Sequence, residues 1–142
     1  MTDKRLLVVD DEQDFGKFVA EVAAGVGYEV HVTSGGAEFI RAYGECKPSV
    51  VVLDVIMPDM DGIEIANWLA GQGFDGHVIV VTGYAPMYAE LVEKLSKAKG
   101  LRSVTNILKP VRAETLRGAL DFDASARESN LDSVTNLSAV ED

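Results

Sequence analysis

The chain has 142 residues, of which 47% are hydrophobic, and carries a formal net charge of −10. This length suits one compact domain, and the hydrophobic content argues against a chain that is disordered overall. The acidic balance argues against direct binding to nucleic acid or to an anionic membrane surface, and no apolar run is long enough for a transmembrane helix.

Apolar runs and amphipathic runs alternate along the chain. The expected strands cover residues 6–10, 28–33, 50–54, 77–82 and 103–108. The expected helices cover residues 14–26, 35–45, the segment after the MPDMDG turn, a run marked by Met87, Leu91, Leu95 and Ala98, and residues 112–121. Apolar residues of the first helix recur at the spacing of one helical face. Gly27 is placed to end that helix, and Ser34 is placed to cap the second one.

This alternation predicts an α/β fold with a doubly wound, five-stranded parallel sheet and helices on both faces. The second strand alternates and carries His31, as an edge strand does, whereas the others are almost continuously apolar. Right-handed crossovers then favour the flavodoxin-like strand order 2-1-3-4-5. We expect one domain over residues 1–121. Residues 122–142 are acidic and rich in Ser and Asn, which predicts a flexible tail.

The single cysteine, Cys46, excludes an internal disulfide and indicates a reducing compartment. The N-terminus does not resemble a signal peptide, because acidic residues follow its short apolar run directly. Together these features predict a cytoplasmic protein.

Polar residues gather where the expected strands end: Asp10 and Asp11 at the first, Asp54 at the third, Thr82 at the fourth and Lys109 at the fifth. In a parallel sheet these ends share one edge, where ligands bind. Three carboxylates together need cations, and Lys109 supplies only one charge. Carboxylate ligands without His or Cys favour Mg²⁺. A divalent ion, a Lys and a Thr around one carboxylate predict a receptor for a phosphoryl group, which could be transferred onto Asp54.

Four segments in this order, VVDDE, LDVIMPDMDG, VTGYA and LKP, resemble the receiver domain of two-component response regulators over residues 4–120. The resemblance implies that Asp54 is the phosphoacceptor. It also implies that Thr82 bonds a phosphoryl oxygen and that Lys109 pairs with Asp54 and with the phosphoryl group.

The resemblance further implies how Mg²⁺ is held. Asp11, Asp54 and the backbone carbonyl of Ile56 would bind the ion directly, whereas Asp10 would act mostly through water. The peptide bond between Lys109 and the following proline resembles the cis bond of the family, a form that bonds preceding proline can adopt at modest cost.

A receiver domain implies a phosphorylation-activated signalling switch rather than an enzyme with a separate substrate. Its expected partners are a sensor histidine kinase or phosphotransfer protein and a downstream protein. Three alternatives stay open: an intermediate phosphorelay receiver that passes its phosphoryl group to another histidine protein, a phosphatase with an Asp nucleophile, and a degenerate receiver that only binds partners. The phosphatase is disfavoured because the acid pair precedes Asp54 and because Ile56 stands where a proton donor is needed.

One position departs from the family pattern. Asn106 lies three residues before Lys109, where relatives commonly have an aromatic residue that moves inward on activation. A small amide cannot fill the same cavity, and its burial requires partners. We therefore expect the signal to be read on a rebuilt surface of the fourth helix, with Tyr84 or Tyr88 as a substitute aromatic.

Overall fold

The computed structural model describes residues 4–55, 57, 59–83 and 86–121, without the side chains of residues 86, 88 and 89. The strands are β1 (Arg5–Val9), β2 (Glu29–Thr33), β3 (Val50–Asp54), β4 (His77–Thr82) and β5 (Ser103–Leu108). The helices are α1 (Gln13–Gly25), α2 (Gly36–Cys46), α3 (Gly62–Gly71), α4 (Pro86–Ala98) and α5 (Ala113–Leu120). Strands and helices alternate, as the sequence predicts.

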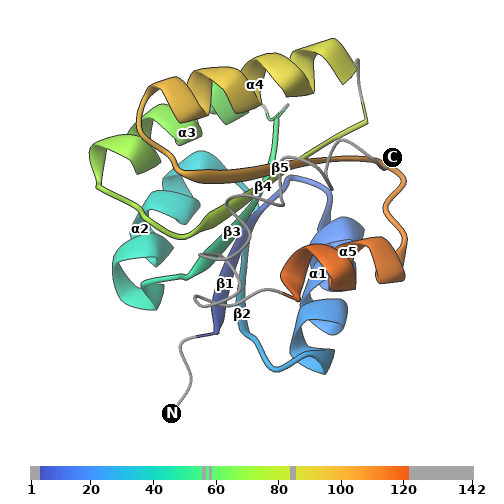
Figure 1. The fold of residues 1–142 in the computed structure, drawn as a ribbon. Coiled ribbons are helices and arrows are strands. Elements are labelled where there is room, and N and C mark those ends of the chain that lie inside the picture. The colour runs from blue at the N-terminus through green and yellow to red at the C-terminus, as the bar shows by residue number, and fades with distance from the viewer. Residues whose placement is uncertain (1–3, 56, 58, 84–85, 122–142) are drawn as a thin grey trace.

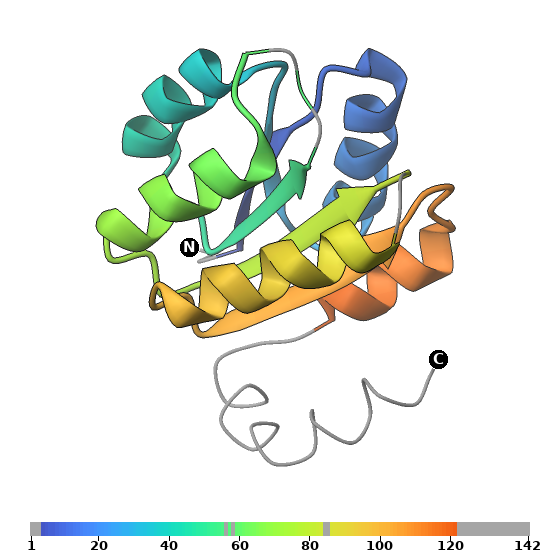
Figure 2. The same cartoon turned by 90° about the horizontal axis from the view of Figure 1, so that it is seen from above.

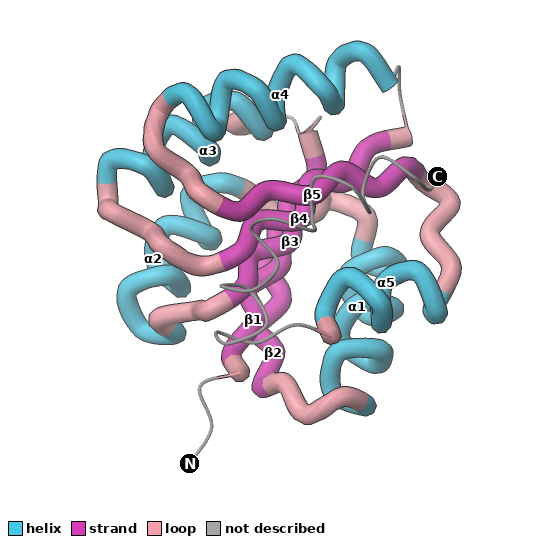
Figure 3. Tube along the Cα trace, in the orientation of Figure 1, coloured by secondary structure: helices cyan, strands magenta, loops and turns pink. Residues whose placement is uncertain are grey.

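The strands form one parallel sheet in the order β2-β1-β3-β4-β5, which confirms the predicted order. Helices α1 and α5 cover one face, and α2, α3 and α4 cover the other (Figure 1). The same two groups of helices flank the sheet when the molecule is turned (Figure 2), and Figure 3 shows the strands as the central layer. The sheet is therefore covered on both sides, with β2 and β5 at its edges.

Each interior strand sends alternate side chains into two separate cores. In β3, Val51 and Leu53 face the core beneath α2, α3 and α4, whereas Val50 and Val52 face the core beneath α1 and α5. All five residues of β3 are buried, so the strand needs apolar residues on both faces. Asp54, the last residue of this strand, is the exception, and the protein must compensate the cost of burying its charge.

The structure tests the predicted end of α1 and the predicted N-cap of α2. Gly27, just after α1, has a φ of 96°, the left-handed conformation that favours glycine. The predicted cap on α2 is wrong: the N-cap residue is Gly35, which has no side chain, and not Ser34. Ser34 instead donates from its backbone N–H and its hydroxyl to Glu38 Oε1, at 3.0 and 3.1 Å. The carboxylate of the first turn reaches back, so the hydroxyl acts as a donor rather than as a cap.

The predicted tail, residues 122–142, lies outside the described residues. Within the described part of the chain, no helix combines the length and the apolar character needed to cross a membrane.

Candidate phosphoryl-accepting site

Three carboxylates meet at the carboxyl edge of the sheet, as the sequence predicts. Asp54 ends β3, while β1 ends one residue earlier than expected, so Asp10 and Asp11 begin the loop into α1. The register pairs Val9 with Leu53, which sets Asp10 level with Asp54 on the neighbouring strand. One oxygen from each of the three carboxylates lies within 4.8 Å of the others. Asp10 and Asp54 are buried, whereas Asp11 is exposed.

Both carboxylate oxygens of Asp10 already have partners. Its Oδ1 accepts a hydrogen bond from the backbone N–H of Glu12 at 2.8 Å, and its Oδ2 accepts one from Lys109 Nζ at 3.1 Å. Burial raises the pKa of the Asp10 carboxyl above its ordinary value, although these two donors oppose that effect. A charged Asp10 is therefore costly here and depends on the cations around it.

Lys109 supplies the positive charge at this edge. It follows β5 directly, and its backbone N–H donates to the carbonyl of Thr82 at 2.9 Å. Its Nζ lies 2.7 Å from Glu12 Oε1 and 3.8 Å from Asp54 Oδ2, in addition to its bond to Asp10. The bond between Lys109 and Pro110 is cis, which confirms the prediction.

The acids around Lys109 govern its protonation. Burial alone pushes the pKa of the Lys109 ammonium down. The hydrogen bonds to Glu12 and Asp10, with the charges of Asp10 and Asp54, outweigh burial and hold this pKa above its ordinary value. The ammonium therefore stays charged near neutral pH.

Thr82 lies at the same edge, at the end of β4, and is fully buried. Because Asp54 pairs with Val81 in the sheet register, Thr82 is one residue further toward the loops that follow the strands. The structure thus brings Asp10, Asp11, Asp54 and Lys109 together and places Thr82 beside them. Ile56, the predicted carbonyl ligand, lies outside the described residues.

Sequence reasoning did not find the environment of Lys109. The ring centroid of Phe15 lies 4.6 Å from Lys109 Nζ, close enough for a cation–π contact. The sequence assigned Phe15 only to the apolar face of the first helix. Glu12 was visible within the segment VVDDE, but nothing in its spacing indicated a partner 97 residues away.

A second missed contact anchors the loop that follows Asp54. The Asp59 carboxylate accepts hydrogen bonds from the backbone N–H of Gly36, at 3.0 and 3.1 Å to its two oxygens, and from that of Ala37 at 3.4 Å. These N–H groups belong to the first turn of α2, where helices lack internal acceptors. A side chain at Gly36 would come within 2.6 Å of Met60, so a glycine is needed for this close approach. The bonds from Gly36 hold the pKa of Asp59 below its ordinary value.

Replacing Asp59 with Ala should lower the urea midpoint of unfolding at neutral pH, because the first turn of α2 loses its acceptor. The folded-state pKa of Asp59 is depressed, so its contribution is present above the unfolded-state pKa and disappears as pH falls through the folded-state value. The difference between parent and variant should therefore shrink in acid. Urea titrations at neutral and acidic pH measure it, with Glu45→Gln, an exposed substitution in α2, as control. An equal difference at both values would contradict the cap.

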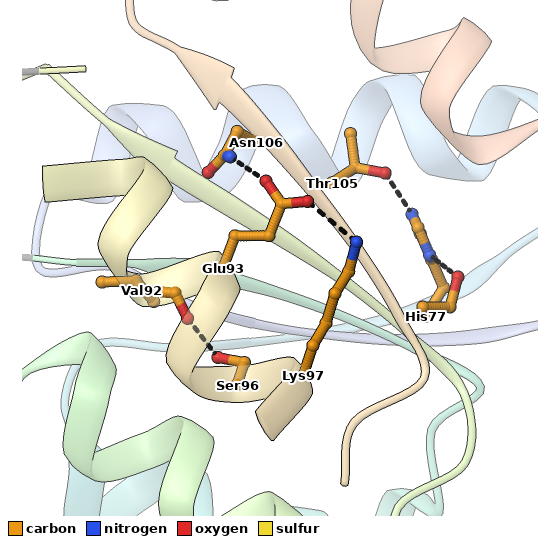
Figure 4. Close-up of polar contacts among 8 residues, drawn as sticks. His77, Val92, Glu93, Ser96, Lys97, Thr105 and Asn106 are labelled. Atoms are coloured by element: carbon orange, nitrogen blue, oxygen red, sulfur yellow. Dashed lines mark hydrogen bonds and ion pairs between the residues drawn. The ribbon is translucent and has the colours of Figure 1, made fainter. Parts of the chain in front are cut away.

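The Asn106 side chain joins β5 to α4 (Figure 4). Its Nδ2 donates to Glu93 Oε1 on α4, and Glu93 Oε2 pairs with Lys97 Nζ at 3.0 Å. Its Oδ1 is buried and has no hydrogen-bond partner within the described part of the chain. The amide nitrogen thus has a partner on the helix predicted to carry the signal, whereas the amide oxygen has none among the described residues. Tyr84 and the side chain of Tyr88 lie outside the described residues, so their substitute role stays a prediction.

Comparison with known proteins gives a consistent relationship. A family model described as the response regulator receiver domain matches residues 6–121. Sporulation initiation phosphotransferase F of Bacillus subtilis is 27% identical over 120 residues, which cover 84% of this chain and 93% of that protein. Response regulator MprA of Mycobacterium tuberculosis is 35% identical over 78 residues, which cover 55% of this chain and 34% of that protein. Regulatory protein AtoC of Escherichia coli is 32% identical over 81 residues, only 18% of its length.

Solved structures show the same fold. Chemotaxis protein CheY4 of Vibrio cholerae is 26% identical with a TM-score of 0.71, over 82% of this chain and 95% of that chain. A receiver domain protein from Clostridium thermocellum is 26% identical with a TM-score of 0.72, over 90% of this chain and 98% of that chain. Because the family match spans nearly all described residues and the acid cluster lies at the expected edge of the sheet, the chain belongs to the response regulator receiver domain family.

Proposed function

We propose that the protein is a phosphorylation-activated signalling switch that accepts a phosphoryl group on Asp54 from a histidine kinase or phosphotransfer protein. One observation carries the proposal: the buried Asp54 carboxylate lies beside two further carboxylates and 3.8 Å from the Lys109 ammonium. No simple structural purpose requires three acids at one strand edge, because their mutual repulsion opposes folding.

The acid cluster fits Mg²⁺. Its donors are carboxylate oxygens alone, the chemistry that this hard cation prefers. Because both oxygens of Asp10 have partners, we propose that Asp11 and Asp54 bind the ion directly and that Asp10 acts through water. The carbonyl of Ile56 is proposed as a further ligand. When bound, Mg²⁺ would offset the carboxylate repulsion and stabilise negative charge on the transferred group.

In the proposed transfer, an oxygen of Asp54 bonds to phosphorus as the phosphorus–nitrogen bond to the donor histidine breaks. The histidine leaves as neutral imidazole after taking up one proton from solvent. Lys109 shifts from its present partners toward Asp54 and a phosphoryl oxygen, where its charge is stabilising. The hydroxyl of Thr82 donates to another phosphoryl oxygen, so Asp54, Thr82 and Lys109 each touch the reacting group.

Incubation with a small phosphodonor and Mg²⁺ should add one phosphoryl group, which intact-mass measurement detects. The Asp54→Ala variant, or the parent with a metal chelator, should gain none, because the acceptor or the charge compensation is missing. Asp14→Asn, an exposed substitution in the first turn of α1, should be modified like the parent. Addition to Asp54→Ala, or addition without metal, would overturn the proposal.

The relative from Bacillus subtilis favours a second candidate role. Its name describes a phosphotransferase, and this chain covers 93% of its length. A protein of that kind passes its phosphoryl group onward instead of acting only through docking. Profiling would mix the protein with labelled phosphorylated histidine kinases and with phosphotransfer proteins. Label that moves on to a histidine indicates a relay, whereas label that stays on Asp54 indicates a terminal switch.

A further inference from the structure

Of the three acids that pair with the Lys109 ammonium, Glu12 lies nearest to it and is the one outside the acid cluster. Its Nζ lies 2.7 Å from Glu12 Oε1, compared with 3.8 Å from Asp54 Oδ2. The Glu12 side chain is 64% exposed, whereas that of Asp54 is 8% exposed. In this structure Lys109 is therefore drawn toward the solvent side of the site.

Among the described residues, the Glu12 carboxylate has no hydrogen-bond or ion-pair partner besides Lys109. It occupies the N-cap position of α1, yet its side chain makes no capping hydrogen bond to the helix. Its backbone serves the helix instead, because its carbonyl accepts from the N–H groups of Phe15 and Gly16, each at 3.1 Å. A backbone carbonyl is available from any residue at this position, so the carboxylate is specific to the contact with Lys109.

The surroundings limit where the ammonium can go. The Phe15 ring approaches Lys109 Nζ within cation–π distance, and Asp10 binds it from the buried side at 3.1 Å. The remaining choice lies between Glu12 and Asp54. While Nζ contacts Glu12 at 2.7 Å, it lies within ion-pair distance of Asp54 at 3.8 Å but beyond hydrogen-bonding distance, so a closer contact with a group on Asp54 would draw the ammonium away from Glu12.

We propose that Glu12 is a positioning residue that holds the Lys109 ammonium away from Asp54 and so slows phosphorylation. The inference rests on the proposed function, because only an incoming phosphoryl group gives the competition a consequence. That group carries up to two negative charges against the single charge of Glu12, so it can draw Lys109 inward once it is in place. The strength of the contact with Glu12 then sets how readily Lys109 moves to the phosphoryl group.

The test compares phosphorylation rates of the full chain at saturating Mg²⁺ with a small phosphodonor. Glu12→Gln should be modified about threefold faster, the scale expected for releasing one partly exposed ion pair. Glu12→Asp keeps the charge but is one methylene too short for the contact, so it should also be faster. Asp14→Asn should match the parent, because Asp14 forms no ion pair with Lys109 in the described part of the chain.

A second readout does not depend on phosphorylation. The side-chain ammonium signal of Lys109 in the nuclear magnetic resonance spectrum of the metal-free protein should shift in Glu12→Gln and Glu12→Asp and stay unchanged in Asp14→Asn. An unshifted signal, or a parental rate in Glu12→Gln, would overturn the inference. A fast Glu12→Gln with a parental Glu12→Asp would also overturn it, since that pattern reports general repulsion of an anionic donor. A parent that is never phosphorylated would instead refute the proposed function.

Discussion

Replacing Asp11 with Asn should raise the free energy of unfolding of the metal-free protein by about 1 kcal/mol and weaken Mg²⁺ binding at least about thirtyfold. The two effects have one cause, the charge of an exposed carboxylate whose oxygen lies within 4.8 Å of those of Asp10 and Asp54. Without metal this charge repels its neighbours, whereas with metal it would act as the proposed ligand.

The size of the stability gain follows from distance and exposure. At 4.8 Å, two unit charges repel by about 1 kcal/mol in the dielectric of water and by about 3.5 kcal/mol at an effective dielectric constant of 20. Asp11 is exposed, so the lower value applies. In contact with Mg²⁺ at about 2.1 Å, one carboxylate charge contributes about 4 kcal/mol even in the dielectric of water. If losing the Asp11 charge removes only half of this attraction, Mg²⁺ affinity falls about thirtyfold.

Urea titration with a chelator measures the first effect, and calorimetric titration with Mg²⁺ measures the second. Asp14→Asn is the matched control, because it removes an exposed acid nearby without touching the cluster; it should change neither quantity appreciably. A clear loss of stability in Asp11→Asn would mean that this residue mainly supports the start of α1. Unchanged Mg²⁺ affinity would exclude Asp11 as a ligand.

The sequence could predict the sheet and the site because both depend on local patterns. The limits of β3, β4 and β5 match the predicted ones, because a polar residue or a glycine lies at or next to each end of these runs. The strand order follows from alternation and crossover handedness. The acid cluster follows from the rule that parallel strands end at one edge, so residues that end strands become neighbours.

Contacts between side chains distant in sequence could not be predicted in this way. Glu12 reaches Lys109 because the residue before α1 and the residue after β5 lie at the same edge of the sheet, and no periodicity encodes that pairing. Ser34 was expected to cap α2, yet the N–H groups of that helix bond to Asp59, which comes from the loop after β3. The need of Asn106 for a partner was predictable from burial, but the identity of that partner was not.

Replacing Lys109 with Met should have effects opposite to those of Asp11→Asn. We expect the metal-free variant to lose about 2 kcal/mol of stability at neutral pH, because removing one partner of a buried ion pair leaves the other charge uncompensated. The loss stays below that of a fully buried pair, since the Lys109 side chain is 18% exposed. Phosphorylation should also slow, because the proposed contact between Lys109 and the phosphoryl group would be lost.

The pH dependence identifies the uncompensated charge. The folded-state pKa of Asp10 is raised mainly by burial, and losing Lys109 raises it further. Ionised Asp10 therefore opposes folding above that pKa, and the cost disappears as pH falls and the carboxyl takes up a proton. Lys109 itself has a raised folded-state pKa, so its contribution in the parent is lost as pH rises through that value. The difference between parent and variant should be largest near neutral pH and shrink on both sides.

The response to Mg²⁺ distinguishes a loss of charge compensation in Lys109→Met from a simple packing defect. In the proposed site Lys109 and the metal ion would neutralise the same carboxylates, so removing Lys109 should leave Mg²⁺ affinity unchanged or higher, and added Mg²⁺ should recover part of the lost stability. Lys97→Met, which removes an exposed lysine paired with Glu93, should cost no more than about 0.5 kcal/mol and should not respond to Mg²⁺. If Lys109→Met instead weakened Mg²⁺ binding, the lysine would be organising the metal ligands rather than competing with the ion for their charge.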